Sequence, residues 1–101
     1  MEHSPSDAEL LALAPTRPEV LGVLYERHAP AVHRYLSRRV GAAVADDLLG
    51  DVFVAAVEGR VRVRPHVSGS ALPWLYGIHR ARARARAALT ALIPTAEESL
   101  R

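Results

Sequence analysis

The chain has 101 residues, 50% of them hydrophobic, which is enough for one small domain with one modest core. It has no cysteine, which excludes a disulfide framework and a cysteine-ligated zinc site, and its net charge is only +2. The N-terminus lacks the basic region and long apolar core of a signal peptide, and no apolar run reaches membrane-spanning length. With only 5% aromatic residues, helix-on-helix packing is favoured, so we predict an all-α domain of about three to five helices. The lack of cysteine fits a reducing cytoplasm.

A capping pattern marks the first helix. Ser6 and Glu9 have the spacing of a capping box in front of the apolar run LLALA, so we predict a short helix from Asp7 to Ala14. Pro15 stops this helix, because proline has no backbone N–H to continue it. We expect residues 1–17 to form an N-terminal tail that carries this short helix.

The second predicted helix has a repeated start signal and an internal proline. Thr16 and Glu19 again have the spacing of a capping box, and Pro18 suits a first turn. We expect this helix to end at Gly41, a natural terminator. Pro30 removes a backbone donor, which predicts a kink or two helices in line. The apolar face of this segment comprises Leu21, Leu24, Tyr25, His28, Val32, Tyr35 and Leu36.

A third helix is predicted from about Ala45 to Glu58. Asp46 and Asp47 then stand in its first turn, where the helix dipole favours negative charge. Gly50 lies mid-helix, which costs about 1 kcal/mol relative to alanine; close packing against a neighbour is one explanation that the sequence leaves open. The apolar stripe of this helix comprises Leu48, Leu49, Val52, Phe53, Ala56 and Val57.

The stretch GRVRVRPHVSGSALP separates the third helix from the next one. Its RVRVR segment alternates as a strand does, but no partner strand is present in the sequence, and a lone strand is not stable. We therefore predict a loop. It is long for a compact domain, and long loops are more often functional than short ones.

The last helix is predicted for the arginine and alanine run GIHRARARARAAL. Both residue types favour helices over strands, so the alternation is placed on a helix from about Pro73 to Leu92. Pro94 marks its end, and residues 94–101 read as a linker or a frayed C-terminus. The apolar stripe comprises Trp74, Ile78, Ala81, Ala85, Leu89 and Leu92. Arginines flank the stripe in two pairs, Arg82 with Arg86 and Arg80 with Arg84.

Charge is distributed unevenly along the chain. No Asp or Glu occurs between Gly59 and Ala96, a span that holds seven arginines and two histidines. The preceding span, from Gly41 to Gly59, holds four acidic residues and no basic one. Such asymmetry indicates at least one charged partner, and the basic span fits nucleic acid. The alternative is a solvated surface on which arginines and carboxylates pair within the molecule.

No enzyme signature is present. The sequence has no Gly-rich phosphate loop, no HExxH motif and no cysteine nucleophile, so we predict a protein that is not an enzyme and that uses no cofactor. The five histidines lack metal-ligand spacing, apart from the pair His28 and His33, which does not align well on a helix, so we predict no metal site.

Two candidate binding surfaces remain. The acidic third helix suits a basic partner helix, although ordinary amphipathicity explains it equally well. The arginine-rich loop and the last helix interleave arginines with aromatic residues, which suits single-stranded nucleic acid, because charge tracks the backbone while rings stack on exposed bases. Trp74 lies on the apolar stripe and is better explained as a core residue. Tyr76 is the better stacking candidate, and His79 fits either interpretation.

Three segments of the chain resemble region 2 of bacterial sigma factors of the sigma-70 family, and the extracytoplasmic-function group most closely. They are LYERHAPAVHRYLSRRVG, ADDLLGDVFVAAVEGR and PWLYGIHRARAR, and together they cover about Val20 to Arg86. The resemblance implies an all-helical domain over residues 18–93 that binds core RNA polymerase and recognises and melts the promoter −10 element. It also implies a cytoplasmic location in bacteria, no membrane insertion, and an anti-sigma factor as a further candidate partner.

The resemblance carries two sets of site residues over by matching position. The third helix corresponds to the one that meets the clamp helices of the polymerase, with Asp47 and Asp51 facing basic groups. The implied polymerase-binding residues are Asp46, Asp47, Leu48, Asp51, Val52 and Phe53. The loop from Arg64 to Leu72 resembles the segment that captures a flipped base of the non-template strand. The implied DNA-binding residues are Arg60, Arg62, Arg64, His66, Ser68, Ser70, Trp74, Tyr76, His79, Arg80, Arg82, Arg84 and Arg86.

The chain departs from the family pattern at three positions. Gly50, Val57 and Ala81 stand where glutamine, tryptophan and asparagine are frequent. A full factor of this group also carries a C-terminal helix-turn-helix module for the −35 element, and none is encoded before Arg101. We therefore expect a piece of a longer protein, a truncated gene product or a stand-alone region 2 protein. These departures favour an alternative function, a degenerate sigma-like interaction module that binds polymerase or an anti-sigma factor without opening the promoter.

Overall fold

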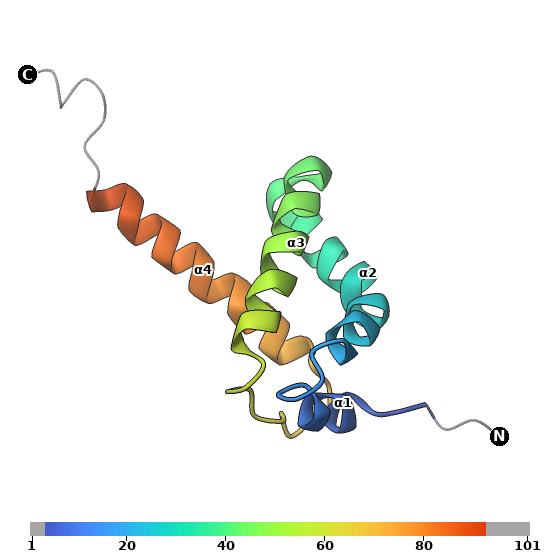
Figure 1. Cartoon of the computed structure of the whole chain (residues 1–101). Coiled ribbons are helices and arrows are strands. Elements are labelled where there is room, and N and C mark those ends of the chain that lie inside the picture. Colours follow the sequence, from blue (N-terminus) through green and yellow to red (C-terminus); the bar gives the residue numbers. More distant parts are fainter. Residues whose placement is uncertain (1–3, 93–101) are drawn as a thin grey trace, which may run out of the picture.

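The computed structural model describes residues 4–92, and within them the chain forms four helices and no strand, which confirms the predicted all-α fold. They are α1 (Asp7–Leu13), α2 (Val20–Val40), α3 (Ala42–Gly59) and α4 (Leu72–Leu92). As Figure 1 shows, α2 and α3 form an antiparallel hairpin, α1 packs on α2, and α4 packs on α3 and α2 with its first half. The predicted C-terminal linker over residues 94–101, and residues 1–3 of the predicted tail, lie outside the described residues.

The first capping box forms as predicted, and the second does not. The side chain of Ser6 accepts a hydrogen bond from the Glu9 N–H at 3.1 Å, and the Ser6 N–H donates to the Glu9 carboxylate. Thr16 caps no helix, because the chain keeps turning after α1 and its hydroxyl donates instead to the Leu13 carbonyl. α2 therefore begins at Val20, without a side-chain cap.

Glycine at position 41 sets the boundary between α2 and α3. α2 continues as one helix through Pro30, so the alternative of two separate helices is wrong. It ends at Gly41, as predicted, where φ is +86°, a conformation that L side chains rarely adopt. Because this one residue makes the whole turn, α3 starts at Ala42, three residues earlier than expected. Asp46 and Asp47 consequently lie outside the first turn of α3, and the helix-dipole argument for them is wrong.

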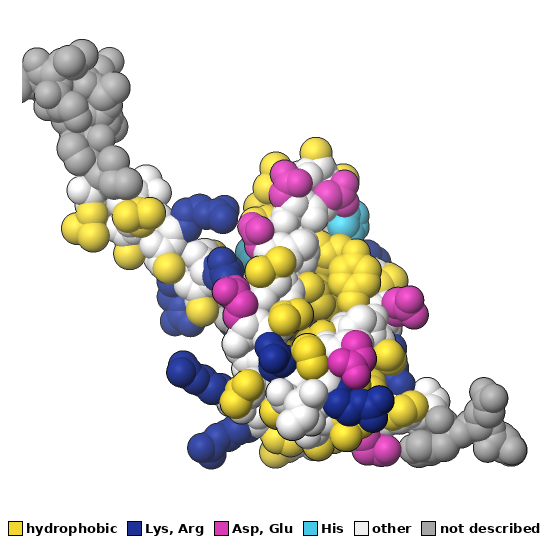
Figure 2. Space-filling model, viewed as in Figure 1, with side chains coloured by type: hydrophobic (Ala, Val, Ile, Leu, Met, Phe, Trp, Pro, Cys, Tyr) yellow, Lys and Arg dark blue, Asp and Glu magenta, His cyan; other side chains and the backbone are white. Residues whose placement is uncertain are grey.

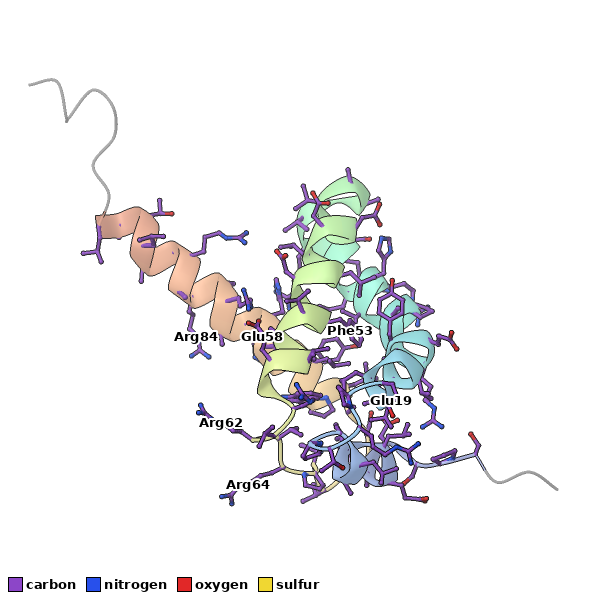
Figure 3. The ribbon with its side chains drawn as sticks, in the orientation of Figure 1. Glu19, Phe53, Glu58, Arg62, Arg64 and Arg84 are labelled. Carbon is purple, nitrogen blue, oxygen red and sulfur yellow. The ribbon has the colours of Figure 1, made fainter. Side chains whose placement is uncertain are left out.

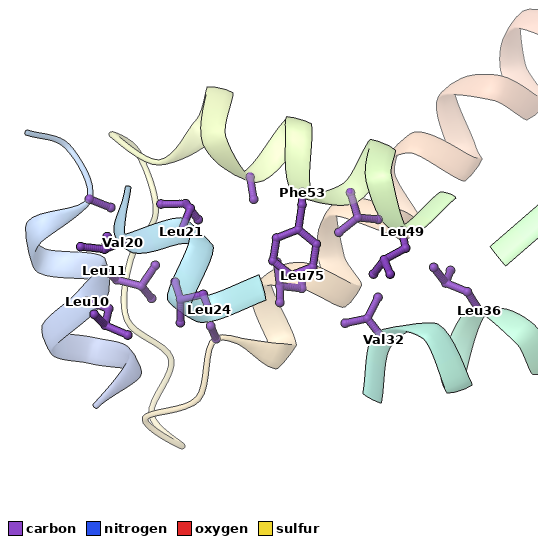
Figure 4. Close-up of a cluster of buried hydrophobic side chains, with 14 of the residues drawn as sticks. Leu10, Leu11, Val20, Leu21, Leu24, Val32, Leu36, Leu49, Phe53 and Leu75 are labelled. Atoms are coloured by element: carbon purple, nitrogen blue, oxygen red, sulfur yellow. The ribbon is translucent and has the colours of Figure 1, made fainter. Parts of the chain in front are cut away.

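The core forms where the apolar faces of the helices meet (Figure 4). The predicted faces of α2 and α3 are largely confirmed, since Leu24, Leu36 and Val52 are almost fully buried. Tyr25 was expected on the buried face but is 43% exposed, although its ring meets Phe53 edge-on at 4.9 Å between centroids. The buried hydrophobic residues are Leu10, Leu11, Ala14, Val20, Leu21, Leu24, Val32, Leu36, Ala45, Leu49, Val52, Phe53, Ala56, Ala71 and Leu75.

Only the first turns of α4 pack against the core. Leu75 is its one buried residue, and Trp74 and Ile78 are half-buried against the core. The remaining members of the predicted stripe, Ala81, Ala85, Leu89 and Leu92, are all exposed. The stripe therefore packs only over its first turns, because α4 extends away from the other helices over its second half (Figure 1). None of the helices within residues 4–92 has the length and apolar character needed to cross a membrane.

The buried carboxylate of Asp7 joins three parts of the fold. One oxygen of Asp7 accepts the Ala71 N–H at 2.7 Å and lies 2.7 Å from His28 Nε2. The other oxygen accepts a hydrogen bond from Arg27 Nη1 at 3.1 Å. The side chain of Asp7 is only 9% exposed. α1, α2 and the residue that precedes α4 are therefore held together by one charged group, which the sequence analysis did not identify.

Replacing Asp7 by asparagine should lower the free energy of unfolding by about 3 kcal/mol, because breaking a largely buried ion pair leaves its partners uncompensated. Urea denaturation measures this change. The matched control is Glu19→Gln, which removes an ion pair with Arg17 whose side chains are 62% and 66% exposed; it should change the free energy by less than about 0.5 kcal/mol. Equal effects of the two substitutions would contradict the role of Asp7.

The contribution of Asp7 should also depend on pH in the acid range. Burial raises the pKa of Asp7, but the hydrogen bonds from the Ala71 N–H, His28 and Arg27 outweigh burial and hold the pKa below its ordinary value of 3.8. A lowered pKa means that the stabilisation is present above about pH 4 and is lost as the pH falls through the folded value. The difference in unfolding free energy between the unmodified chain and Asp7→Asn should therefore shrink below about pH 4. A difference that stays constant down to about pH 2 would refute this linkage.

Gly50 has no packing explanation. It is exposed, and apart from its chain neighbours and the nearby backbone of its own helix, no atom lies within 4 Å of the position that a Cβ would take there. The explanation by close packing, which the sequence left open, is therefore excluded. Gly50→Ala should raise the free energy of unfolding by about 1 kcal/mol, because alanine restricts the unfolded chain and favours the helix. Urea denaturation again gives the value, and a loss of stability would show that the local backbone needs glycine.

Candidate nucleic-acid and protein interfaces

The outer face of α3 is acidic. Asp47, Asp51 and Glu58 are exposed along it, together with Val54, which is 60% exposed (Figure 2). These residues recur at the spacing of one helical face, so a partner that lies along α3 meets all of them. Asp46 is also exposed, but its carboxylate lies 2.7 Å from His33 Nε2 on α2, an ion pair when that histidine is protonated.

The apolar members of the predicted polymerase-binding set lie inward. Val52 and Phe53 are buried in the core, and Leu48 is half-buried. They hold α3 against α2 and are not available to a partner on the outer face. Of the six residues in that set, the structure therefore presents Asp47 and Asp51 as exposed carboxylates without an ion pair inside the described part of the chain.

The loop between α3 and α4 has two free arginines and one that is used internally. Arg62 and Arg64 extend away from the helices (Figure 3), and neither forms an ion pair with any residue of 4–92. Arg60 instead donates to the Val57 carbonyl at 2.8 Å and to the Ala14 carbonyl at 3.1 Å. Arg60 therefore closes the end of α3 and ties the loop to the end of α1.

The polar residues of the loop mostly bond to one another. His66 Nδ1 accepts the Ser68 N–H at 3.0 Å and lies 2.8 Å from the Ser68 hydroxyl. Ser70 accepts the Leu72 N–H at 3.1 Å, which supports the start of α4. RVRVR forms no strand, in agreement with the predicted loop. Ser68 and Ser70 thus shape the loop, while Val67 at its tip is fully exposed.

The arginines of α4 point toward two different helices, α2 and α3, as their helical spacing requires. Arg80 and Arg84 line a hollow of about 420 Å³ with α2. Arg82 and Arg86 line a different cavity, of about 590 Å³, between α4 and α3. Arg82 lies 3.7 Å from the Glu58 carboxylate, and both side chains are more than half exposed, so this contact contributes little. Within the described residues, Arg82 therefore forms an ion pair, and Arg80, Arg84 and Arg86 form none.

An aromatic cluster joins α2 to α4. The ring centroids of Tyr35 and Tyr76 lie 4.5 Å apart, and the His79 ring meets the Tyr35 ring edge-on with 5.8 Å between centroids. The guanidinium of Arg39 lies over the Tyr35 ring at 4.3 Å from its centroid. Tyr76, the predicted stacking residue, is half-buried and already packed against another ring. Sequence analysis missed Tyr35 and Arg39 as members of this surface, although the arginine and tyrosine content of RYLSRR was a usable signal.

Positive charge converges on His79. Burial lowers the pKa of His79, and the guanidinium groups of Arg39, Arg80 and Arg86 lower it further below the ordinary value of 6.5. Burial is the largest cause of this lowering, and no carboxylate is among the groups that shift the pKa of His79. Within the described residues, no group of three His, Asp or Glu side chains gathers in a way that could hold a metal ion. The arrangement suits the binding of a polyanion.

Replacing Arg39 by glutamine should raise the pKa of His79 toward 6.5, because one of the nearby positive charges is removed while most of the side-chain volume remains. An NMR titration of the His79 ring protons measures this shift. Arg17→Gln is the control, since Arg17 is paired with Glu19 on an exposed segment and should leave the titration of His79 unchanged. An unshifted His79 in Arg39→Gln would contradict the converging field.

A family model described as Sigma-70 region 2 matches residues 24–89, which comprise most of α2, all of α3, the loop and nearly all of α4. Searches of curated proteins and of solved structures find no match. The matching family consists of domains of transcription initiation factors and is not a family of enzymes. Since the match covers more than half of the 101 residues, the chain belongs to the sigma-70 region 2 family, whose domains act with RNA polymerase at promoters.

Proposed function

We propose that the chain is the region 2 domain of an extracytoplasmic-function sigma factor, which binds core RNA polymerase and recognises and melts the promoter −10 element. One observation carries this proposal most strongly. Uncompensated carboxylates lie on the outer face of α3, while uncompensated arginines lie on the loop and on α4. Two partners of opposite charge therefore have a surface each on one small domain, and the two surfaces meet at the cavity that Asp51, Arg82 and Arg86 line.

The proposed polymerase contact is the outer face of α3. Asp47 and Asp51 are exposed and lie one helical turn apart, so two basic groups on the clamp helices can be met at once. Val54 lies next on the same face and offers an apolar contact. The buried residues Val52 and Phe53 act indirectly, because they fix α3 against the core.

The proposed DNA contact is the loop together with α4. A base of the non-template strand that leaves the duplex loses its stacking, which costs a few kcal/mol, and its capture by the protein offsets that cost. The loop between Arg64 and Leu72 is held in shape by hydrogen bonds from Ser68 and Ser70, which supports its use as a preformed receptor. Arg62, Arg64 and the α4 arginines supply charge to the backbone of the strand.

A second candidate function is an interaction module that binds polymerase or an anti-sigma factor without opening DNA. Two observations favour it. Gly50 leaves the outer face of α3 without a side chain between its two carboxylates, and Ala81 places a methyl group on the exposed part of α4 where base recognition would need a polar group.

Asp47→Arg combined with Asp51→Arg should abolish co-purification with core RNA polymerase, because repulsion replaces attraction at two adjacent contacts. The matched control is Glu19→Arg with Glu26→Arg, which makes the same charge change at exposed positions away from α3 and should leave co-purification intact. Retained binding in the Asp47 and Asp51 double variant would refute the assignment of α3.

Transcription distinguishes the two candidate functions. Core enzyme with this chain should produce run-off transcripts from a template library randomised over the −10 element, with one sequence class enriched. Binding of a single promoter strand should weaken with salt, with a log–log slope of about −0.7 for each phosphate contacted. Polymerase binding without any transcript would favour the interaction module, and strand binding that is insensitive to salt would contradict the arginine surface.

A further inference from the structure

α2 presents three arginines that the family resemblance did not assign to DNA. We propose that the groove between the C-terminal half of α2 and the middle of α4 binds the phosphodiester backbone of a single DNA strand, with Arg34 and Arg38 of α2 as direct phosphate contacts. This inference rests on the proposed function, because it extends the DNA surface of the loop and α4 onto a third element.

The groove consists of two adjoining hollows. Each has a volume of about 420 Å³, and Tyr35 and Arg39 border both of them. One is lined by Ala31, Arg34, Tyr35, Arg38, Arg39 and Tyr76. The other is lined by Tyr35, Arg39, His79, Arg80, Ala83 and Arg84. Five arginines therefore line these two hollows, and no carboxylate lines either of them.

The arginines of this groove are not neutralised. Within residues 4–92, none of the five forms an ion pair. Of the nearby acidic residues of α3, Asp46 is held by His33. Asp51 lines the cavity between α3 and α4, which shares Arg39, His79 and Ala83 with the second hollow but lies on its far side from Arg34 and Arg38, since neither of these lines it. Arg39 also borders that cavity but makes no ion pair with Asp51. Burial lowers the pKa of His79 at the groove wall, and the charges of Arg39, Arg80 and Arg86 lower it further.

The floor of the groove is rigid. Tyr35 is fixed by ring contacts with Tyr76 and His79, and Arg39 lies over its ring. A fixed aromatic floor with arginines along both rims is the arrangement that tracks a single nucleic-acid strand. Arg34 and Arg38 are one helical turn apart, about 6 Å along the axis, so each can contact a different phosphate. Guanidinium groups bind phosphate oxygens with paired donors, which a lone ammonium cannot do.

The test compares double-arginine variants by fluorescence anisotropy of a labelled single strand of twelve nucleotides at several salt concentrations. Arg34→Ala with Arg38→Ala should weaken binding at least about tenfold at low salt and reduce the magnitude of the log–log salt slope by about 1.4, the value for two lost phosphate contacts. Arg17→Ala, at an exposed ion-paired position remote from the groove, should bind as the unmodified chain does. Circular dichroism and co-purification with core polymerase should be unchanged in the α2 variant.

The outcomes separate this inference from the proposed function. An α2 variant with unaltered affinity and slope, beside a loop variant Arg62→Ala with Arg64→Ala that loses affinity, would overturn the groove and leave the proposed function standing. Failure of the unmodified chain to bind the strand would overturn both. A variant that loses affinity for the duplex of the same sequence but keeps its affinity for the single strand would also overturn the groove as a single-strand site.

Discussion

A single buried carboxylate connects three parts of this small domain. Asp7 is the only charged residue buried among residues 4–92, and it ties α1 to α2 and to the backbone at Ala71. Arg60 holds the other end of the same loop to the Ala14 carbonyl. The candidate DNA loop is thus anchored at both ends on the first helical segment, which precedes the residues that match the sigma-70 region 2 family. In this chain, an element outside the family match therefore positions the part of the family domain proposed to capture a base.

Helical periodicity then separates the charges. Asp47 and Asp51 lie four residues apart on the exposed face of α3, while Arg80 and Arg84 turn toward α2 and Arg82 turns toward α3. Only the last of these arginines reaches a carboxylate, across a solvent-exposed gap of 3.7 Å that confers little stability. Most of these charged side chains are therefore unpaired within the described part of the domain and available to partners. After burial, the charges of Arg39, Arg80 and Arg86 also contribute to the lowered pKa of His79.

Short-range sequence signals predicted the helices well, but they could not predict contacts between residues far apart in the sequence. The capping box of Ser6 and the stop at Gly41 follow from short-range chemistry, and both are present. Thr16 has the same capping spacing as Ser6 and fails, because the turn after α1 takes its hydroxyl. The role of Asp7 depends on Ala71, 64 residues away, and no pattern of neighbours reveals it. The alanine-rich stripe of α4 packs only over its first turns, because its small side chains permit packing but do not require it.

This small helical domain thus offers a cationic surface to a DNA strand and an anionic surface to the polymerase. Amide chemical-shift mapping of the isotope-labelled chain, titrated with an unlabelled single strand, tests it most directly. We expect shifts over the loop from residue 60 to 72, the C-terminal half of α2 and the arginine-rich part of α4, with the amides around Asp47 and Asp51 unmoved. Shifts centred on the outer face of α3, or spread evenly over all four helices, would contradict it.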